Sequence, residues 1–316
     1  MRIATYNLRY DSQPDKISVR ESIEALPSPL ERPRFHGWSG EVPWSTRRLK
    51  VAQQLLLESP NVIGFQEALV RQVHDLAELL GDDWAWVGVG RDDGKRAGEF
   101  CPIFYKKSDL TLDHHESFWL SDKPFEPSKY PDAGSFRVCE VTRFKTTTKT
   151  FTVLNSHLDD RSDAQRRLAA SMLLARARYE AYATSSPVFI TGDFNSASHG
   201  SDSGAYQIIT GVVPPVPINE TFAEKYKVPV HGDEKDAKFV MVDLKGETPR
   251  MQVAGDFATF TGFNRPGDTS VYTRIDFVFG GSSSGWTADA YKVGTSLTDD
   301  GILASDHRPV YADVTI

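Results

Sequence analysis

The sequence predicts a layered α/β domain in which strands outnumber helices. Apolar runs of strand length recur along the chain, and the predicted helices lie between groups of strands. The composition, 40% hydrophobic and 25% charged, is typical of a soluble globular protein. A length of 316 residues allows one large domain or two ordinary ones. Because helices are interspersed among the strands, we expect one domain over residues 1–316.

The first elements are a strand and a long proline-rich stretch. Residues 2–8 have the pattern of a buried strand that ends in polar residues. Residues 11–46 are rich in proline and lack a helical or strand-like period, so we expect a long loop inserted at the surface, of a kind that is often functional. Trp38 and Trp44 in this loop are the tryptophans best suited to stack on a nucleobase.

Two helices and a short strand follow the loop. Apolar residues recur at helical spacing over residues 47–58 and 70–80, and Pro60 and Gly81 stop the two helices. Residues 62–66 between them form a short apolar run that predicts a buried strand.

The remaining predicted elements are mostly strands. A long helix is expected over residues 164–183, with Leu168, Met172 and Tyr179 facing the interior. Residues 199–250 are rich in glycine, proline and charge, with only short apolar runs. Further strands are expected at residues 84–89, 102–105, 136–144, 151–156, 187–191, 275–279 and 308–314.

Charge and hydropathy exclude some classes of function. The net charge is −7 and the basic residues are dispersed, which disfavours tight, non-specific binding of duplex DNA. No run of about 18 apolar residues occurs, so we expect no membrane-spanning segment. The N-terminus lacks the apolar core of a signal peptide, so we expect a soluble protein that is either cytoplasmic or secreted with its leader removed.

Polar side chains recur where apolar strands end or begin. A strand holds such a side chain rigidly yet leaves it open to solvent, which is how a scaffold positions catalytic groups. Carboxylate and amide oxygens are ligands that suit a hard cation such as Mg²⁺ or Mn²⁺. The residues at these positions are Asn7, Glu67, His157, Asp193, Asn195, Asp276, Asp306 and His307.

Most of these positions also have an ordinary structural explanation. Glu67 alone could be a favourable charge at a helix N-terminus, and residues 192–195 a turn. Residues 305–307 could cap a helix. Asp276 is harder to explain in this way, because a buried and unpaired carboxylate is costly. We expect Asp276 to have a partner, and a histidine is a suitable one.

In their order along the chain, these motifs resemble the endonuclease/exonuclease/phosphatase superfamily, which has the DNase I-like fold. The resemblance implies a four-layer α/β/β/α sandwich of two mixed sheets flanked by helices, with one active site at an end of the sandwich. Residues 87–105 resemble a compact microbial branch of the superfamily. Within this stretch, Arg91, Lys95 and Arg96 either contact a phosphate near the site or belong to a solvated charged loop. The six matching motifs are Thr5-Tyr6-Asn7, Gly64-Phe65-Gln66-Glu67, Asn155-Ser156-His157-Leu158-Asp159, Gly192-Asp193-Phe194-Asn195, Ile275-Asp276-Phe277 and Ser305-Asp306-His307.

The resemblance implies one Mg²⁺ site, with Mn²⁺ as the alternative ion. Glu67 would be the principal ligand, with Asn7 and Asp306 nearby. Some members of the superfamily carry an acidic residue two positions after the first asparagine, whereas this chain has Arg9 there. This difference argues against a second metal ion at the same edge.

The resemblance also implies catalytic roles. Asp193 would orient and deprotonate the attacking water, with Asn195 holding the water or the phosphate. His307, paired with Asp276, would contact a phosphoryl oxygen and stabilise its charge, and His157 would do so from the opposite side. These groups suit phosphoryl transfer, which needs mainly positioning and charge stabilisation.

The implied function is Mg²⁺-dependent hydrolysis of a phosphoester, as a phosphodiesterase or a phosphatase, by attack of an activated water. We expect a phosphorylated small-molecule or lipid-like substrate and a monomeric protein. One alternative is a nuclease acting on single-stranded or small nucleic acid, against which the net charge and the histidine at position 157 argue. An alternative of another class is a catalytically inactive binding module, against which the intact motifs argue.

Overall fold

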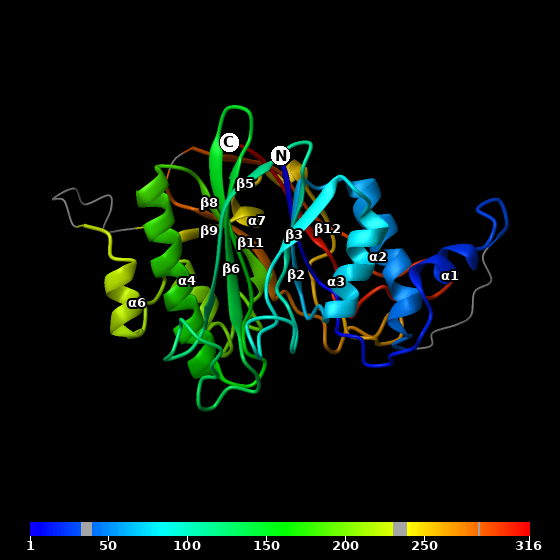
Figure 1. The fold of residues 1–316 in the computed structure, drawn as a ribbon, viewed down its shortest axis with the longest axis horizontal. Coiled ribbons are helices and arrows are strands. Elements are labelled where there is room, and N and C mark those ends of the chain that lie inside the picture. Colours follow the sequence, from blue (N-terminus) through cyan, green and yellow to red (C-terminus); the bar gives the residue numbers. More distant parts are fainter. Residues whose placement is uncertain (33–39, 230–238, 284) are drawn as a thin grey trace.

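A computed structural model describes residues 1–32, 40–229, 239–283 and 285–316 of the chain. Two mixed β-sheets, one of seven strands and one of six, pack face to face, and helices lie against the outer face of each sheet (Figure 1). This four-layer α/β/β/α sandwich confirms the expected fold class.

The seven-stranded sheet carries the N-terminal strand at its centre. In spatial order its strands are β10 (Val253–Gly255), β12 (Thr287–Val293), β13 (Val310–Thr315), β1 (Arg2–Asn7), β2 (Val62–Gln66), β4 (Ile103–Lys106) and β3 (Trp84–Val87). β1 is parallel to β2 and antiparallel to β13, and Asn7 stands opposite Gln66. The carboxyl ends of β1 and β2 therefore reach the same edge, where Asn7 and Glu67 come close together.

The six-stranded sheet brings three polar residues to one edge. In spatial order its strands are β5 (Thr111–Trp119), β6 (Val138–Lys145), β7 (Thr150–His157), β8 (Val188–Asp193), β11 (Asp276–Gly281) and β9 (Met241–Asp243). β7 is parallel to β8, and His157 stands opposite Asp193. β11 is antiparallel to β8, and Asp276 also stands opposite Asp193. These pairings put the three side chains in one row across the sheet.

Helices cover both outer faces, as Figure 1 shows for α4 and α6 on one side and α2 and α3 on the other. The apolar sides of α2 (Trp44–Glu58) and α3 (Val70–Leu80) pack on the seven-stranded sheet. α4 (Asp163–Thr184), α5 (Gly204–Ile209) and α6 (Glu220–Lys225) pack on the six-stranded sheet. Among the described residues, no helix has both the length and the apolar character needed to cross a membrane.

The inner faces of the two sheets share one hydrophobic core. Successive side chains of a strand point to opposite faces, so Ile3 faces this core while Ala4 packs under the helices. Ile3 and Val62 of one sheet meet Val153 and Phe189 of the other, all fully buried. Because a single core joins the two sheets, we infer that the described residues form one domain.

The predicted helices and strands are present, with ends that differ by a few residues. α2 begins at Trp44, ahead of the expected start at residue 47, and its N-cap residue Pro43 makes no side-chain capping hydrogen bond. β3 ends at Val87, since Gly88 has φ +149° and leaves the strand. The elements that the sequence did not reveal are mostly short or polar, which hides their period; they are α1 (Val19–Glu24), α5, α6, α7 (Leu244–Glu247), a 3₁₀ turn (Arg250–Gln252), β5, β9, β10 and β12.

The proline-rich stretch of residues 11–46 contains more structure than a loop. α1 lies within it and begins with a capping box formed by Ser18 and Glu21. Trp44 is fully buried in α2 and donates its Nε1–H to Asp75 Oδ2 at 2.9 Å, so its proposed role in stacking on a nucleobase was wrong. Residues 33–39, with Trp38, lie outside the described residues.

Candidate active site

Asp193 lies at the centre of the site, where the edges of the two sheets meet. Its Oδ2 accepts a hydrogen bond from Asn7 Nδ2 at 2.9 Å, and its Oδ1 accepts the backbone N–H of Asn195 at 2.9 Å. The Nε2 atoms of His157 and His307 each lie 3.6 Å from the same Oδ2. One carboxylate oxygen therefore contacts an amide and faces two imidazoles.

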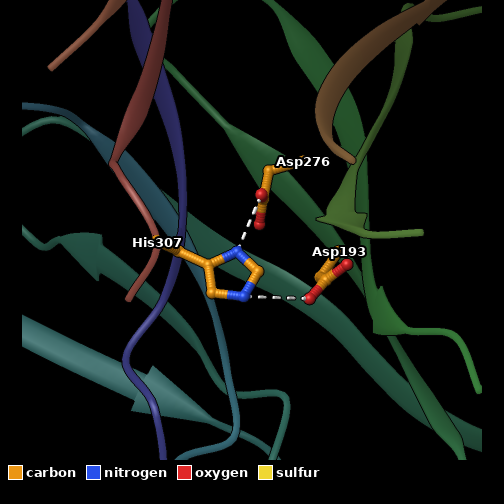
Figure 2. A group of neighbouring side chains, drawn as sticks. All are labelled: Asp193, Asp276 and His307. Atoms are coloured by element: carbon orange, nitrogen blue, oxygen red, sulfur yellow. Dashed lines mark hydrogen bonds and ion pairs between the residues drawn. The ribbon is translucent and has the colours of Figure 1, made fainter. Parts of the chain in front are cut away.

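His307 is held between two aspartates, as Figure 2 shows. Its Nδ1 lies 2.9 Å from Asp276 Oδ2, which confirms the expected histidine partner of Asp276. Burial alone would lower the pKa of His307, but Asp276 and Asp193 outweigh it and raise the pKa to about 10. His307 is therefore an imidazolium at neutral pH, with Nδ1–H donated to Asp276 and Nε2–H directed toward Asp193.

The carboxyl group of Asp193 is easily protonated for an aspartate. Burial and the nearby charge of Asp276 raise its pKa to about 7, while the His307 cation acts in the opposite sense. A carboxylate with a pKa close to neutral pH is suited to accept a proton from water.

His157 differs from His307 in its protonation. Asn195 Nδ2 donates to the carbonyl of Leu158 at 3.0 Å, and because a carbonyl only accepts, this contact assigns the orientation of the amide. The same Nδ2 lies 2.9 Å from His157 Nε2, which must then accept. Burial, with the charges of Arg137 and Arg91, holds the pKa of His157 well below its usual value. His157 is therefore neutral, with its proton on Nδ1.

A second group of polar residues forms the neighbouring edge. Glu67 Oε1 accepts from Asn7 Nδ2 at 3.0 Å, and Glu67 Oε2 accepts from the backbone N–H of Tyr10 at 3.1 Å. Burial raises the pKa of Asp306, and the charge of Glu67 adds to this while His307 opposes it. Arg9 lies 4.0 Å from Glu67, and its backbone N–H donates to Asn7 Oδ1 at 2.9 Å.

Three residues of the site have a left-handed backbone. The φ angles of Arg9, Glu67 and Asn195 are 56°, 58° and 44°. Such conformations are uncommon for residues with a Cβ atom and persist where the surrounding structure holds them, often at functional sites. Each lies within two residues of a strand end, and each lines the cavity of the site.

The donor set at this edge fits a hard divalent cation. Glu67 and Asp306 are carboxylates that repel each other, and Asn7 keeps one free lone pair on Oδ1. Asp193, Asp276 and His307 form a second candidate group, since their ligand atoms lie within 4.8 Å of one another. An imidazole must be deprotonated to bind a metal, and the raised pKa of His307 opposes this. The edge with Glu67 and Asp306 is therefore the better candidate.

A buried arginine holds the segments beside this edge. Arg47 is fully buried on α2, and its Nη1 donates to the carbonyls of Leu8 at 2.6 Å and Ala304 at 3.0 Å. Its Nη2 donates to the carbonyl of Arg9 at 3.1 Å. One guanidinium thus ties the end of β1 to the segment that leads into the last motif. The helical pattern of residues 47–58 does not indicate this role.

The site opens into a cavity of about 800 Å³. The structure brings all eight predicted site residues to this region, although Asn7 and Asp276 support the cavity wall without lining it. Arg91 lines the cavity, whereas Lys95 and Arg96 are exposed and do not. Residues without a predicted role that line it include Tyr10, Glu99, Ser135, Arg137, Asp160, Arg161 and Phe260. Arg137 could have been noticed, because a charge at the start of an apolar strand requires partners.

A family model described as Endonuclease/Exonuclease/phosphatase family matches residues 4–307 of the chain. This range includes all the residues of the site and all the strands except β13 and the first two residues of β1. A comparison with curated proteins gave no match.

Several solved structures are similar to this chain along its whole length. The endonuclease/exonuclease/phosphatase from Bacteroides vulgatus is 28% identical, with a TM-score of 0.74, over 100% of this chain and 98% of that chain. The mannosyl-6-phosphatase of Bacteroides thetaiotaomicron is 24% identical, with a TM-score of 0.72, over 100% of both chains. TDP2 of D. rerio, complexed with a single-strand DNA product, is 15% identical, with a TM-score of 0.61, over 100% of this chain and 99% of that chain. The last two similarities concern the fold alone.

Proposed function

Because the chain belongs to the Endonuclease/Exonuclease/phosphatase family, whose members hydrolyse phosphoesters, we propose that it is a divalent-metal-dependent phosphoester hydrolase acting through an activated water. The observation that carries this proposal is the position of Asp193, whose Oδ2 lies 3.6 Å from Nε2 of both His157 and His307. A proton acceptor and an imidazolium thus face the same point in the cavity.

The edge formed by Glu67, Asp306 and Asn7 would hold the metal ion, which we propose to be Mg²⁺, with Mn²⁺ as the alternative. When bound, such an ion neutralises charge on the phosphoryl oxygens. The family generally uses divalent metals, which supports this assignment. Asn7 would keep Glu67 in place through its hydrogen bond of 3.0 Å.

The remaining residues would position and activate the water. Asp193 accepts the proton that the water loses as it attacks phosphorus. His307 donates its Nε2–H to a phosphoryl oxygen and stabilises the negative charge there, and Asp276 keeps it protonated. His157 is neutral and orients Asn195, whose amide faces the cavity beside Asp193.

The substrate that we propose is a phosphorylated small molecule. A similar structure is that of a mannosyl-6-phosphatase, which supports a monoester of a small alcohol. Another is that of TDP2 with a single-strand DNA product, which keeps a nuclease or nucleic-acid phosphodiesterase as the alternative. The net charge of −7 weighs against the alternative.

A metal-dependence assay tests the proposal. The full chain is first stripped of metal with a chelator and then assayed with p-nitrophenyl phosphate and bis-p-nitrophenyl phosphate, with and without Mg²⁺ or Mn²⁺. We expect turnover that depends on the added ion. Absence of turnover of every phosphoester with either ion would indicate a catalytically inactive binding module. Efficient cleavage of oligonucleotides at low enzyme concentration would favour the nuclease.

A further inference from the structure

A second group of polar side chains lines the cavity on the other side of His157 from Asp193. The His157 ring has Nε2 3.6 Å from Asp193 and Nδ1 4.0 Å from Glu99 Oε2. Glu99 is paired with Arg91, and the charge of Arg137 acts on both Glu99 and His157. We call Arg91, Glu99 and Arg137 the polar wall.

The charges of the polar wall are already balanced. Arg91 forms a forked pair with Glu99, with N–O distances of 2.6 and 3.0 Å. Arg137 donates to Asp159 at 3.1 Å and to Asp160 at 2.8 Å. A second anionic group on the ligand would meet carboxylates as well as guanidiniums, so the polar wall is not built for a second phosphate.

Several donors nevertheless have no hydrogen-bond partner within the described part of the chain. They are Arg91 Nε, Arg137 Nη1 and His157 Nδ1. Arg137 and His157 are only 4% and 5% exposed. A buried donor without an acceptor is costly, and such groups in native structures need an explanation. A ligand with several oxygen atoms, bound in the cavity that these residues line, would supply acceptors for these donors after small side-chain rotations.

The loop that carries Arg91 and Glu99 is fixed before any ligand binds. The backbone N–H of Arg91 donates to the carbonyl of Glu99 at 3.0 Å, so the two residues face each other across a hairpin. Trp119 Nε1 donates to the carbonyl of Arg91 at 2.7 Å. Asp93 Oδ1 accepts three backbone N–H groups at the tip of the loop, at 2.8 to 2.9 Å. A rigid polar surface of this kind discriminates between ligands by hydrogen-bond geometry.

We propose that the polar wall binds the hydroxyl groups of an uncharged, polyhydroxylated leaving group, so that the substrate is a sugar phosphate. This inference rests on the proposed function, because the phosphate must be held at Asp193 for the alcohol to reach Glu99. Glu99 accepts hydrogen bonds from the hydroxyls, and Arg91 and Arg137 donate to their oxygens.

Other leaving groups fit the wall less well. A lipid chain would desolvate the paired charges without replacing their hydrogen bonds. A nucleobase needs an aromatic face, and the aromatic residues that line the described cavity are Tyr10 and Phe260. Phe260 packs on His307, with ring centroids 4.9 Å apart, and so belongs to the catalytic side.

Steady-state kinetics of the metal-loaded full chain test this assignment. The substrates are a hexose 6-phosphate, its 2-deoxy analogue and p-nitrophenyl phosphate, which has no hydroxyls. We expect Glu99→Gln to lower kcat/KM for the hexose 6-phosphate about ten-fold or more, the effect of one hydrogen bond to a charged group. The loss of kcat/KM for p-nitrophenyl phosphate should be smaller, so that the preference for the hexose 6-phosphate over p-nitrophenyl phosphate falls.

Removing a hydroxyl from the substrate gives a measurement that distinguishes binding by Glu99 from a purely structural role of this residue. If Glu99 binds the deleted hydroxyl, the losses caused by the deoxy substrate and by Glu99→Gln will not add, because both remove the same contact. Other single-deoxy hexose phosphates extend the test to each hydroxyl. Arg96→Gln, on the same loop but exposed and outside the cavity, is the matched control and should behave as wild type.

Two outcomes would overturn the inference. One is an equal loss of activity toward both classes of substrate in Glu99→Gln, and the other is a preference of the wild type for oligonucleotides or lipid phosphates over hexose phosphates. Binding separates this inference from the proposed function. Calorimetry of Asp193→Asn protein with a hexose 6-phosphate should show affinity that Glu99→Gln weakens. If this holds while the wild type hydrolyses no phosphoester, the hydrolase proposal fails and the sugar site stands.

Discussion

The amide Nδ2 of Asn7, at the end of β1, donates to Asp193 Oδ2, at the end of β8, over 2.9 Å. The two residues belong to different sheets, so this hydrogen bond joins the edges of the sandwich at the site. The same Nδ2 also donates to Glu67 at 3.0 Å. Asn7 therefore couples the proposed metal-binding edge to the proposed proton acceptor.

Asp193→Asn should abolish most of the activity while leaving the fold intact. We expect kcat/KM to fall by about 10²–10⁴-fold, the usual contribution of a general base. The free energy of unfolding should change little, because two effects oppose each other. The substitution removes a costly buried charge, but it also replaces one of the two carboxylate oxygens that accept hydrogen bonds. Kinetics and a thermal melt measure both effects. Asp113→Asn, exposed on β5, is the control, and near wild-type activity in Asp193→Asn would refute the role.

Glu67→Gln should weaken the binding of Mg²⁺ by about ten-fold or more, since even residues that only support metal ligands contribute a factor of that size. Isothermal titration calorimetry on metal-free protein measures the affinity directly. His307→Ala should leave it nearly unchanged. The opposite pattern, with loss in His307→Ala alone, would assign the ion to Asp193, Asp276 and His307.

Activity should depend on pH with two limbs. Asp193 must be ionised to accept a proton, so activity should rise as pH increases through its pKa of about 7. His307 must be protonated to donate, so activity should fall as pH increases through its pKa of about 10. Asp276→Asn removes a charge that raises the pKa of His307, and the alkaline limb should move to lower pH by about one unit or more. An unmoved alkaline limb would contradict the role of Asp276.

Protonation of His307 should also stabilise the folded protein. Its pKa is raised above the ordinary value of 6.5, so the folded state binds the proton more tightly than the unfolded chain. This contribution is complete below about pH 6.5 and is lost as pH rises to about 10. Thermal melts of the wild type and His307→Gln across this range should converge at the alkaline end.

Arg47→Lys and Arg48→Lys form a matched pair on α2. Both arginines are fully buried, but Arg47 holds the carbonyls of Leu8 and Ala304 beside the site, whereas Arg48 pairs with Asp75 on α3. Lysine cannot reproduce a fork of hydrogen bonds, so we expect each variant to lose about 1–3 kcal/mol of unfolding free energy.

Only Arg47→Lys should also weaken Mg²⁺ binding, because it alone loosens the segments that carry Asn7 and Asp306. Calorimetry under conditions where both variants remain folded makes the comparison. Equal metal affinity in the two variants would show that Arg47 acts on stability alone.

The layered α/β class and the polar residues at the strand ends were predictable because they depend on local patterns, whereas the four-layer sandwich was implied by the resemblance to the superfamily. An apolar strand followed by a polar residue is visible in a few consecutive positions, and this signal marked Asn7, Glu67, His157 and Asp193. The buried and lone Asp276 also required a partner on energetic grounds. The short helices and polar strands were missed, since they are too brief or too polar to show a period.

The sequence by itself therefore determined the layered α/β class and the polar residues at the strand ends. Only the tertiary structure decided how these residues act together, because Asn7 and Asp193 are 186 positions apart and meet through strand register. Burial and neighbouring charges, which exist only after packing, make His307 a cation and His157 neutral. For the same physical reason, the polar wall of Arg91, Glu99 and Arg137 emerges only when the hairpin loop and the segment that precedes β6 line one cavity.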